Sequence, residues 1–277
     1  GGLLDVRVHP VRKNEIYFTY SLPQGQSATT ALARGTLEGT QLKQVKNIFV
    51  AHEANSNEIH FGSRIEFDRD GHIFITVGDR NERKQVQDLG YHMGKVLRLN
   101  EDGSAPQDNP FVQNKKARPE IWALGIRSPQ GMAWHPSTGD LWVAEMGPRG
   151  GDELNIIKKG LNYGWPLITY GREYWGGKIG EKEKAGLEQP IIYWTPSISP
   201  SAMTFYTGSL FPQWKNNIFL ANLSSRHLRR LVLEGNKVVQ QEELLKDEAR
   251  FRNVRTGPDG ALYVSTDDGK IARLTKK

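Results

Sequence analysis

The sequence contains no cysteine, which excludes both a disulfide framework and a thiolate metal site. No stretch approaches the roughly 20 consecutive apolar residues that a membrane-spanning helix requires. The amino terminus lacks the charged-then-apolar pattern of a secretory signal. It opens directly into the apolar run Leu3, Leu4, Val6 and Val8, which predicts that preceding sequence is missing. Helical patterns are scarce too, and only residues 242–248 have a helix-leaning composition.

The charge is not concentrated in any one part of the chain. Of the 277 residues, 37% are hydrophobic and 25% charged, a composition typical of a globular protein that buries a substantial core. The formal net charge is +6, but the basic residues are scattered, with only short clusters such as Lys115 and Lys116. This favours solubility or the steering of an anionic ligand over nucleic-acid binding. A single domain over residues 1–277 is expected.

Five segments of the chain share one plan. Each has a short alternating strand, a turn rich in Asp, Asn, Gly or Pro, and a second strand of β-branched and aromatic residues. The segments begin at Leu3, Ser63, Gln130, Ser201 and Phe251. Each resembles the inner hairpin of a propeller blade, and the abrupt start suggests that one further blade precedes Gly1. The sequence therefore predicts an all-β fold, a six-bladed β-propeller of four-stranded antiparallel blades whose first blade is missing.

The turn residues locate these hairpins more precisely in the sequence. Asp-Gly pairs at residues 70–71 and 259–260 predict tight turns between alternating strands. A further strand is expected over residues 95–99, where the sequence reads KVLRL. Polar runs rich in Gly and Pro predict loops over residues 100–117 and 176–186.

Five ordered runs carry a resemblance to a known family. They are HFGSRIEFDRDGHIFITVGDR from His60, MGKVLRLNEDGSAPQDNPF from Met93, IWALGIRSPQGMAWHP from Ile121, AEMGPRGGDELNIIKKGLNYGWP from Ala144 and RFRNVRTGPDG from Arg250. Together they resemble the glucose/sorbosone dehydrogenase family, and within it the soluble aldose sugar dehydrogenases that use pyrroloquinoline quinone (PQQ) and Ca²⁺. The resemblance implies a quinoprotein oxidoreductase that converts aldoses to lactones. It also implies an external electron acceptor, a periplasmic or secreted location, and a monomer or homodimer.

The histidine of the matching HxxxR pattern is His60, which lies in the loop before the second hairpin. In the family this histidine is the general base that takes the proton of the anomeric hydroxyl, a role suited to an imidazole. The resemblance places Arg127, in GIRSPQG, against the quinone oxygens, where a permanent charge suits the task. Ser128 stands where relatives often have Asn. The other histidines considered are expected to be structural or exposed: His52, His72, His92, His135 and His227.

Arg250 and Arg252 alternate in the last repeat, so both side chains are expected on one face. Their RxRxV pattern matches family residues near the cofactor carboxylates, with which arginines pair well. The fold is expected to gather these two arginines, His60 and Arg127 around a single pocket.

The run GPRGGDE, from Gly147, combines a turn rich in carbonyls with two acids, which suits a hard cation better than a phosphate. The resemblance implies that the backbone carbonyls of Gly147 and Pro148 hold the calcium that binds the quinone. Glu153 and Tyr163 are implied for a second, structural calcium. A capped turn and a buried tyrosine remain the alternative explanation of these two residues.

The chain departs from the family at two places. Ser224 aligns with a lysine that contacts the cofactor in relatives, and Arg226 is a candidate substitute. A family glutamine expected immediately before Gly1 is absent from this numbering. Tyr174 and Trp175 are candidates for a substrate-facing loop.

Two other functions stay open. One is a calcium-dependent, lactonase-like hydrolase, which is disfavoured because acids do not recur at the ends of the inner strands. The other is a non-catalytic binding propeller, which the serine at position 224 and the truncated start favour.

Overall fold

The sheets of the described residues are built from antiparallel strands. The computed structural model describes residues 1–276, which form nineteen strands, two short 3-10 helices and no α-helix. The chain divides into two compact units, and each is described by itself. No helix among the described residues has the length and apolarity needed to cross a membrane.

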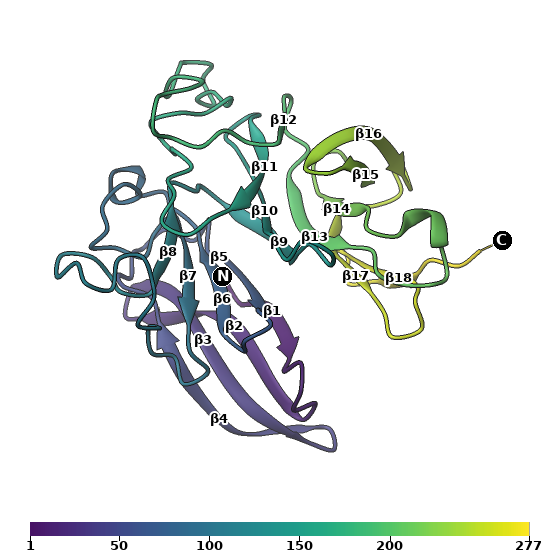
Figure 1. The fold of residues 1–277 in the computed structure, drawn as a ribbon, viewed down its shortest axis with the longest axis horizontal. Helices are drawn as coiled ribbons and strands as arrows, with labels where there is room; N and C mark the ends of the chain where they lie inside the picture. Colours follow the sequence, from purple (N-terminus) through teal and green to yellow (C-terminus); the bar gives the residue numbers. More distant parts are fainter. Residues whose placement is uncertain (277) are drawn as a thin grey trace. The chain divides into compact units, whose positions relative to one another are not determined.

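The first unit comprises Gly1–Pro129, Lys158–Leu167 and Ala185–Glu188. It holds two four-stranded sheets, each with its strands in chain order (Figure 1). The first sheet consists of β1 (Leu3–Val8), β2 (Glu15–Gln24), β3 (Ser27–Glu38) and β4 (Gln41–Val50). The second consists of β5 (Gly62–Phe67), β6 (Ile73–Val77), β7 (Lys95–Leu99) and β8 (Ile121–Leu124). The helix η1 (Arg83–Gln85) lies between β6 and β7.

The second unit holds three sheets, apart from Pro129 at the start of β9. The first consists of β9 (Pro129–Trp134), β10 (Leu141–Glu145), β11 (Asp152–Ile157) and β12 (Ile192–Trp194). The next consists of β13 (Pro200–Phe205), β14 (Ile218–Asn222), β15 (Leu228–Glu234) and β16 (Lys237–Leu244), with η2 (Pro212–Trp214) between β13 and β14. The last has three strands, β17 (Phe251–Thr256), β18 (Leu262–Thr266) and β19 (Ile271–Arg273).

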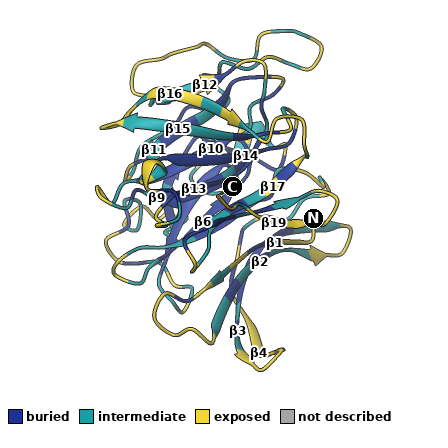
Figure 2. Ribbon diagram, turned by 90° about the vertical axis from the view of Figure 1, so that its right-hand side faces the viewer, coloured by how far each residue is buried: buried dark blue, intermediate teal, exposed yellow. Residues whose placement is uncertain are grey.

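In the sheet β13–β16, burial falls from one edge strand to the other. In the second unit every residue of β13 and β14 is buried, whereas none of β16 is. In the first unit β6 and β7 are wholly buried, but only one residue of β4 is (Figure 2). Packed apolar side chains such as Ile65 and Leu97 form the core of the first unit. Each such side chain contributes roughly 1.5–3 kcal/mol when fully buried.

All five predicted hairpins are present, as β1–β2, β5–β6, β9–β10, β13–β14 and β17–β18. The strand expected at residues 95–99 is β7. The fold class is therefore an all-β propeller with four-stranded antiparallel blades. Residues 1–276 form five blades and not six, one from each hairpin, and the sixth blade was expected before Gly1. The last blade has three strands.

The buried histidine His135 caps the turn between β9 and β10. Its Nδ1 accepts the backbone N–H groups of Ser137 and Thr138, at 3.2 and 3.1 Å, so the ring is held neutral. Burial lowers its pKa, although the charge of Asp140 acts in the opposite direction. Near a pH of about 6.5, the unfolded chain therefore binds more protons at this residue than the folded chain does.

We expect His135 to make the free energy of unfolding decrease as pH falls from 7 to 5. The slope from this residue is at most about 1.4 kcal/mol per pH unit. In His135→Asn the amide oxygen still accepts the two N–H groups but does not titrate, so the slope becomes smaller. Urea unfolding at several pH values measures it, and an equal slope in both proteins would refute the assignment.

Candidate functional site

His60 lies in the connection between β4 and β5, in the first unit. Its backbone has φ = +54°, in the left-handed region that most side chains avoid. Gly78, just after β6, makes this placement possible, because a Cβ there would lie 2.0 Å from the carbonyl oxygen of His60. The backbone N–H of Gly78 donates to the carbonyl of Phe61 at 3.1 Å. The loop is thus packed closely against the end of β6.

The imidazole of His60 is held by Asp79. Its Nδ1 lies 2.7 Å from Oδ1 of Asp79, whose Oδ2 accepts the indole N–H of Trp165 at 2.8 Å. The backbone N–H of Asn81 donates to Oδ1 at 2.9 Å. Burial acts to raise the pKa of Asp79, but the hydrogen bond from His60 and the charges of His60 and Arg127 outweigh it and lower the pKa below its ordinary value. The ionised carboxylate therefore fixes the ring proton on Nδ1 and leaves the lone pair on Nε2.

Arg127 completes this cluster. Its Nη2 lies 3.3 Å from Nε2 of His60, and its guanidinium carbon lies 5.5 Å from the centre of the Trp165 ring. The carbonyl of Arg127 accepts the backbone N–H of Asp79 at 2.7 Å. Ser128, the next residue, is buried. A guanidinium and a basic nitrogen therefore converge on one point.

Asp79 and Trp165 were missed by the sequence analysis. Asp79 lies two residues after the end of the buried strand β6, and an acid close to a strand end was the available signal. Trp165 was given no role there. Its indole N–H needs an acceptor when buried, and that requirement could have drawn attention to it.

In the second unit, the loop 147–151 is organised by Asp152. The carboxylate accepts the backbone N–H groups of Gly147, Ile198 and Ser199, at 2.7–2.8 Å, and the hydroxyl of Ser197. Burial raises the pKa of Asp152, while these hydrogen bonds act in the opposite direction. A Cβ on Gly147 would lie 2.3 Å from the carbonyl oxygens of residues 150 and 151, so the turn is closely folded on itself. The predicted cation loop is therefore compact and rich in carbonyls.

Asp152→Asn should lower the free energy of unfolding by about 1–3 kcal/mol, because the amide group faces N–H donors that then lack an acceptor. Urea unfolding measures the loss. Asp140→Asn, on the partly exposed turn after β9, is the control and should change little. Equal stability of Asp152→Asn and the unmodified protein would contradict the role assigned to this carboxylate.

The residues implied for a second calcium lie in different units. Glu153, on β11, accepts a hydrogen bond from the side-chain amide of Asn155 at 3.2 Å. Burial, with a contribution from the charge of Asp152, raises the pKa of Glu153 to about 7. Tyr163 belongs to the first unit, is buried, and accepts the backbone N–H of Lys158 at 2.8 Å. Each therefore has a partner within its own unit.

Arg250 and Arg252 do share one face, as predicted. Both bind the same carboxylate, since Nε of Arg250 lies 2.8 Å from Oδ2 of Asp267 and Nε of Arg252 lies 2.7 Å from Oδ1. Their side chains are 47% and 49% exposed, so both guanidinium groups keep room for a further anion. Asp267 was not predicted.

Ser224 and Arg226 make separate contacts. The hydroxyl of Ser224 donates to the carbonyl of Ser197 at 3.0 Å and accepts from the hydroxyl of Ser199 at 2.8 Å. Nη2 of Arg226 donates to the carbonyl of Asp247 at 3.0 Å. In the candidate substrate loop, Tyr174 and Trp175 are 69% and 80% exposed.

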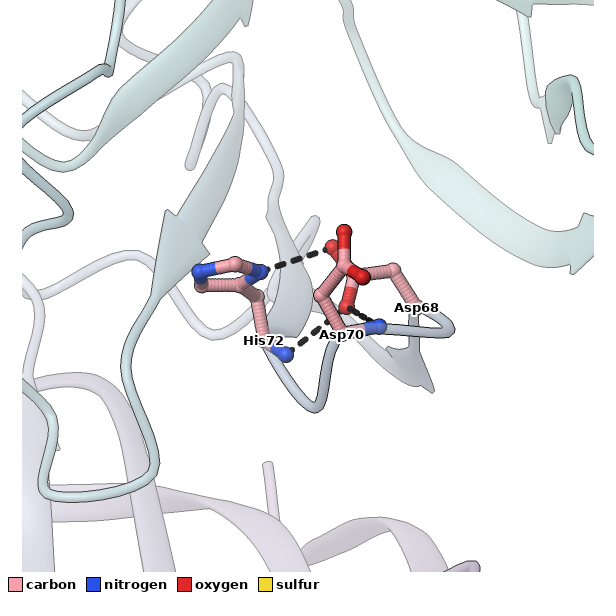
Figure 3. Close-up of side chains that lie close together, drawn as sticks. All are labelled: Asp68, Asp70 and His72. Atoms are coloured by element: carbon pink, nitrogen blue, oxygen red, sulfur yellow. Dashed lines mark hydrogen bonds and ion pairs between the residues drawn. The ribbon is translucent and has the colours of Figure 1, made fainter.

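A further group of acids and a histidine lies at the turn between β5 and β6 (Figure 3). Oδ1 of Asp68 accepts the backbone N–H groups of Asp70 and His72, while Oδ2 lies 2.9 Å from Nδ1 of His72. Nη2 of Arg98 lies 3.1 Å from the same Nδ1. Asp68 therefore closes the predicted Asp-Gly turn, and the neighbouring guanidinium opposes a cation there.

The comparisons with known proteins cover nearly the whole chain. A family model described as Glucose / Sorbosone dehydrogenase matches residues 1–273. Over 288 residues the chain is 43% identical to the aldose sugar dehydrogenase YliI of Escherichia coli (strain K12), covering 100% of this chain and 78% of that protein.

Two solved structures are similar as well. A crystal structure of glucose dehydrogenase matches with a TM-score of 0.97 at 43% identity, covering 100% of this chain and 83% of the other. The PQQ-bound form of aldose sugar dehydrogenase from Streptomyces coelicolor matches with a TM-score of 0.79 at 26% identity, covering 96% of this chain and 74% of the other. The similarity therefore includes the segments that carry His60, Arg127 and the loop 147–151.

Proposed function

Because the chain belongs to the glucose/sorbosone dehydrogenase family, we propose that it oxidises aldose sugars at the anomeric carbon to lactones, with PQQ as its cofactor. Similarity to a relative named aldose sugar dehydrogenase supports the substrate class. Similarity to a PQQ-bound relative supports the cofactor. The observation that carries the proposal is the hydrogen-bonded cluster of Asp79, His60 and Arg127.

His60 is the proposed general base. As the anomeric hydroxyl loses its proton to Nε2, the hydrogen on the same carbon leaves with its electron pair, and the C–O bond becomes the C=O of the lactone. Asp79 keeps the other ring proton on Nδ1, so that Nε2 is available throughout. The same carboxylate stabilises the imidazolium that forms. Arg127 stabilises negative charge that develops beside Nε2.

The donor set fits PQQ, which carries quinone oxygens and three carboxylates. We assign the quinone end to His60, Arg127 and Ser128, and the carboxylates to the half-exposed Arg250 and Arg252, as the family resemblance implies. When bound, PQQ would supply the hydride acceptor, and an external electron acceptor would take up the electrons. The planar guanidinium of Arg127 can donate to quinone oxygens through more than one N–H.

The loop 147–151 fits Ca²⁺, because hard cations prefer oxygen ligands and this turn is rich in backbone carbonyls. We propose that the carbonyls of Gly147 and Pro148 hold a calcium ion that, when bound, polarises the quinone. Glu153 and Tyr163 are proposed for a structural calcium. The raised pKa of Glu153 is consistent with a cation nearby in the working protein, because a positive charge would offset the cost of burying the carboxylate.

The proposed location, oligomeric state and electron acceptor follow from the family resemblance. We infer a periplasmic or secreted enzyme, monomeric or homodimeric, that takes an aldose and passes electrons to an external acceptor. A non-catalytic binding propeller is the second candidate, favoured by the serine at position 224, whose hydroxyl is bonded within its own unit. A lactonase-like hydrolase remains the third.

One reconstitution separates the three. The protein is mixed with PQQ, Ca²⁺, an aldose and an artificial dye acceptor, and each component is omitted in turn. Dye reduction that requires both PQQ and Ca²⁺ supports the dehydrogenase. Lactone hydrolysis without PQQ would identify the hydrolase, and PQQ or sugar binding without turnover would identify the binding protein.

A further inference from the structure

Arg80 is a buried cation, 1% exposed, on the turn that follows β6. Its hydrogen bonds among the described residues go to neutral oxygens. Nη1 donates to the carbonyl of Ile59 at 2.5 Å, and Nη2 donates to Oδ1 of Asn55 at 2.9 Å and to the carbonyls of Ala28, at 3.2 Å, and Asn57. Burial lowers its pKa to about 10, although the charge of Asp79 acts in the opposite direction. A buried guanidinium costs desolvation energy, so its retention needs an explanation.

The contacts of Arg80 surround His60 in the sequence. Ile59, on one side of His60, gives its carbonyl to Nη1. Phe61, on the other side, places its ring 3.5 Å beneath the guanidinium carbon. The side-chain amide of Asn55 donates back to the carbonyl of Arg80 at 3.0 Å, which ties the two segments together. One side chain therefore holds both peptide neighbours of the imidazole.

The backbone conformation near His60 explains why these contacts of Arg80 are needed. His60, Arg80 and Asn81 all have positive φ, between +50° and +62°. Residues in this region persist only where their surroundings fix them, because the conformation is unfavourable for side chains with a Cβ. Asp79 fixes the imidazole of His60, and Arg80 fixes the loop that carries His60. The planar guanidinium donates to these loop oxygens and lies flat against the ring of Phe61 at the same time, an arrangement that the compact ammonium of a lysine does not reproduce.

We propose that Arg80 is a positioning residue for His60, which it holds through the carbonyl of Ile59 and the ring of Phe61. The inference rests on the proposed role of His60 as the base. It predicts that weakening the contacts of Arg80 displaces Nε2 of His60 without removing any group that touches the sugar. Small displacements of a catalytic group cause large losses of rate, so turnover suffers more than sugar binding.

The test compares Arg80→Lys with Arg98→Lys. Arg98 is a matched control, because it is also buried, lies 5.1 Å over the ring of Trp122, and is bonded to Asp108 and His72 rather than to the His60 loop. We expect kcat of Arg80→Lys to fall roughly 10- to 100-fold with KM for the aldose changed less than threefold. Arg98→Lys should keep the kcat of the unmodified protein.

A second readout does not depend on turnover. The ¹⁵N NMR shifts of the His60 ring report which nitrogen carries the proton, and Arg80→Lys should change these shifts while Arg98→Lys does not. If the unmodified protein fails to oxidise aldoses, the proposed function fails, and the ring spectrum still decides whether Arg80 positions His60. An unchanged His60 spectrum, or an unchanged kcat in an active protein, overturns the proposal. Should Arg80→Lys not fold, Phe61→Leu removes the ring contact and must reproduce both changes on a smaller scale.

Discussion

Replacement of His60 by alanine will lower kcat for aldose oxidation by about 10²- to 10⁴-fold, the usual contribution of a positioned base. The variant loses the nitrogen proposed to accept the hydroxyl proton, while Arg127 and Ser128 remain. PQQ binding, followed by its absorption spectrum, should therefore weaken much less than turnover. Steady-state dye reduction with saturating PQQ and Ca²⁺ gives kcat directly.

The control for this experiment is His52→Ala. His52 lies in the same connection between β4 and β5, but its side chain is 41% exposed and faces Glu53, so we expect less than a twofold change. A His60→Ala protein that binds PQQ and turns over aldose at the rate of the unmodified protein would exclude the imidazole as the base. A loss of stability would appear in thermal unfolding and would be recognised there.

The second large effect is expected from Asp79→Asn, with a fall in kcat of about 10²- to 10⁴-fold and a small change in KM. An asparagine can turn its amide N–H toward Nδ1 of His60, which moves the ring proton to Nε2 and removes the base. The oxygen of the amide would still serve Trp165. Turnover measured across pH 6–9 should stay low throughout. The substitution changes which ring nitrogen carries the proton, and a change of pH does not reverse that.

Asp68→Asn provides the matched control, since Asp68 and His72 form another Asp–His pair in the same unit, 2.9 Å apart. It should keep full activity. Because the folded pKa of Asp79 is lowered, the stability that this carboxylate provides is present above its unfolded value of about 3.9 and disappears only as pH falls through the lower folded value. The stability deficit of Asp79→Asn should therefore be constant between pH 6 and 8. A deficit that shrinks over this range, or full activity, would contradict the assignment.

The hairpins could be predicted because their signals are local. Alternation across the Asp-Gly pair places Ile65 and Ile75 opposite each other, and they are register partners in β5 and β6. The turn closes through Asp68, two residues before Asp70. Such contacts span a few residues, so a single sequence contains the information that they need.

The helix-leaning composition of residues 242–248 was misleading. Its first three residues are the end of β16, where Glu242 and Glu243 stand opposite Arg230 and Arg229 of β15. Both pairs are ion pairs, at 2.6 and 2.8 Å. These cross-strand ion pairs outweighed the weak intrinsic preference of the segment for a helix. Composition alone does not show which residues will face one another across a sheet.

The partners of the site residues were the part that sequence did not reveal. Family patterns identified His60 and Arg127, but Asp79 and Trp165 lie 19 and 105 positions from the histidine, and only folding brings them together. Asp267 likewise lies 15 residues beyond Arg252. Each of these residues provides a hydrogen-bond or ion-pair partner for a buried or charged group. A sequence shows which groups need such a partner, but it does not show which residue provides it.

Two chain segments, the loop 147–151 and residues 197–199, depend on the single carboxylate of Asp152. Their carbonyl oxygens are therefore oriented before any ligand arrives, and little conformational entropy is lost when one does. Such a loop should discriminate among cations by size, because it cannot easily widen or contract around an ion of a different radius.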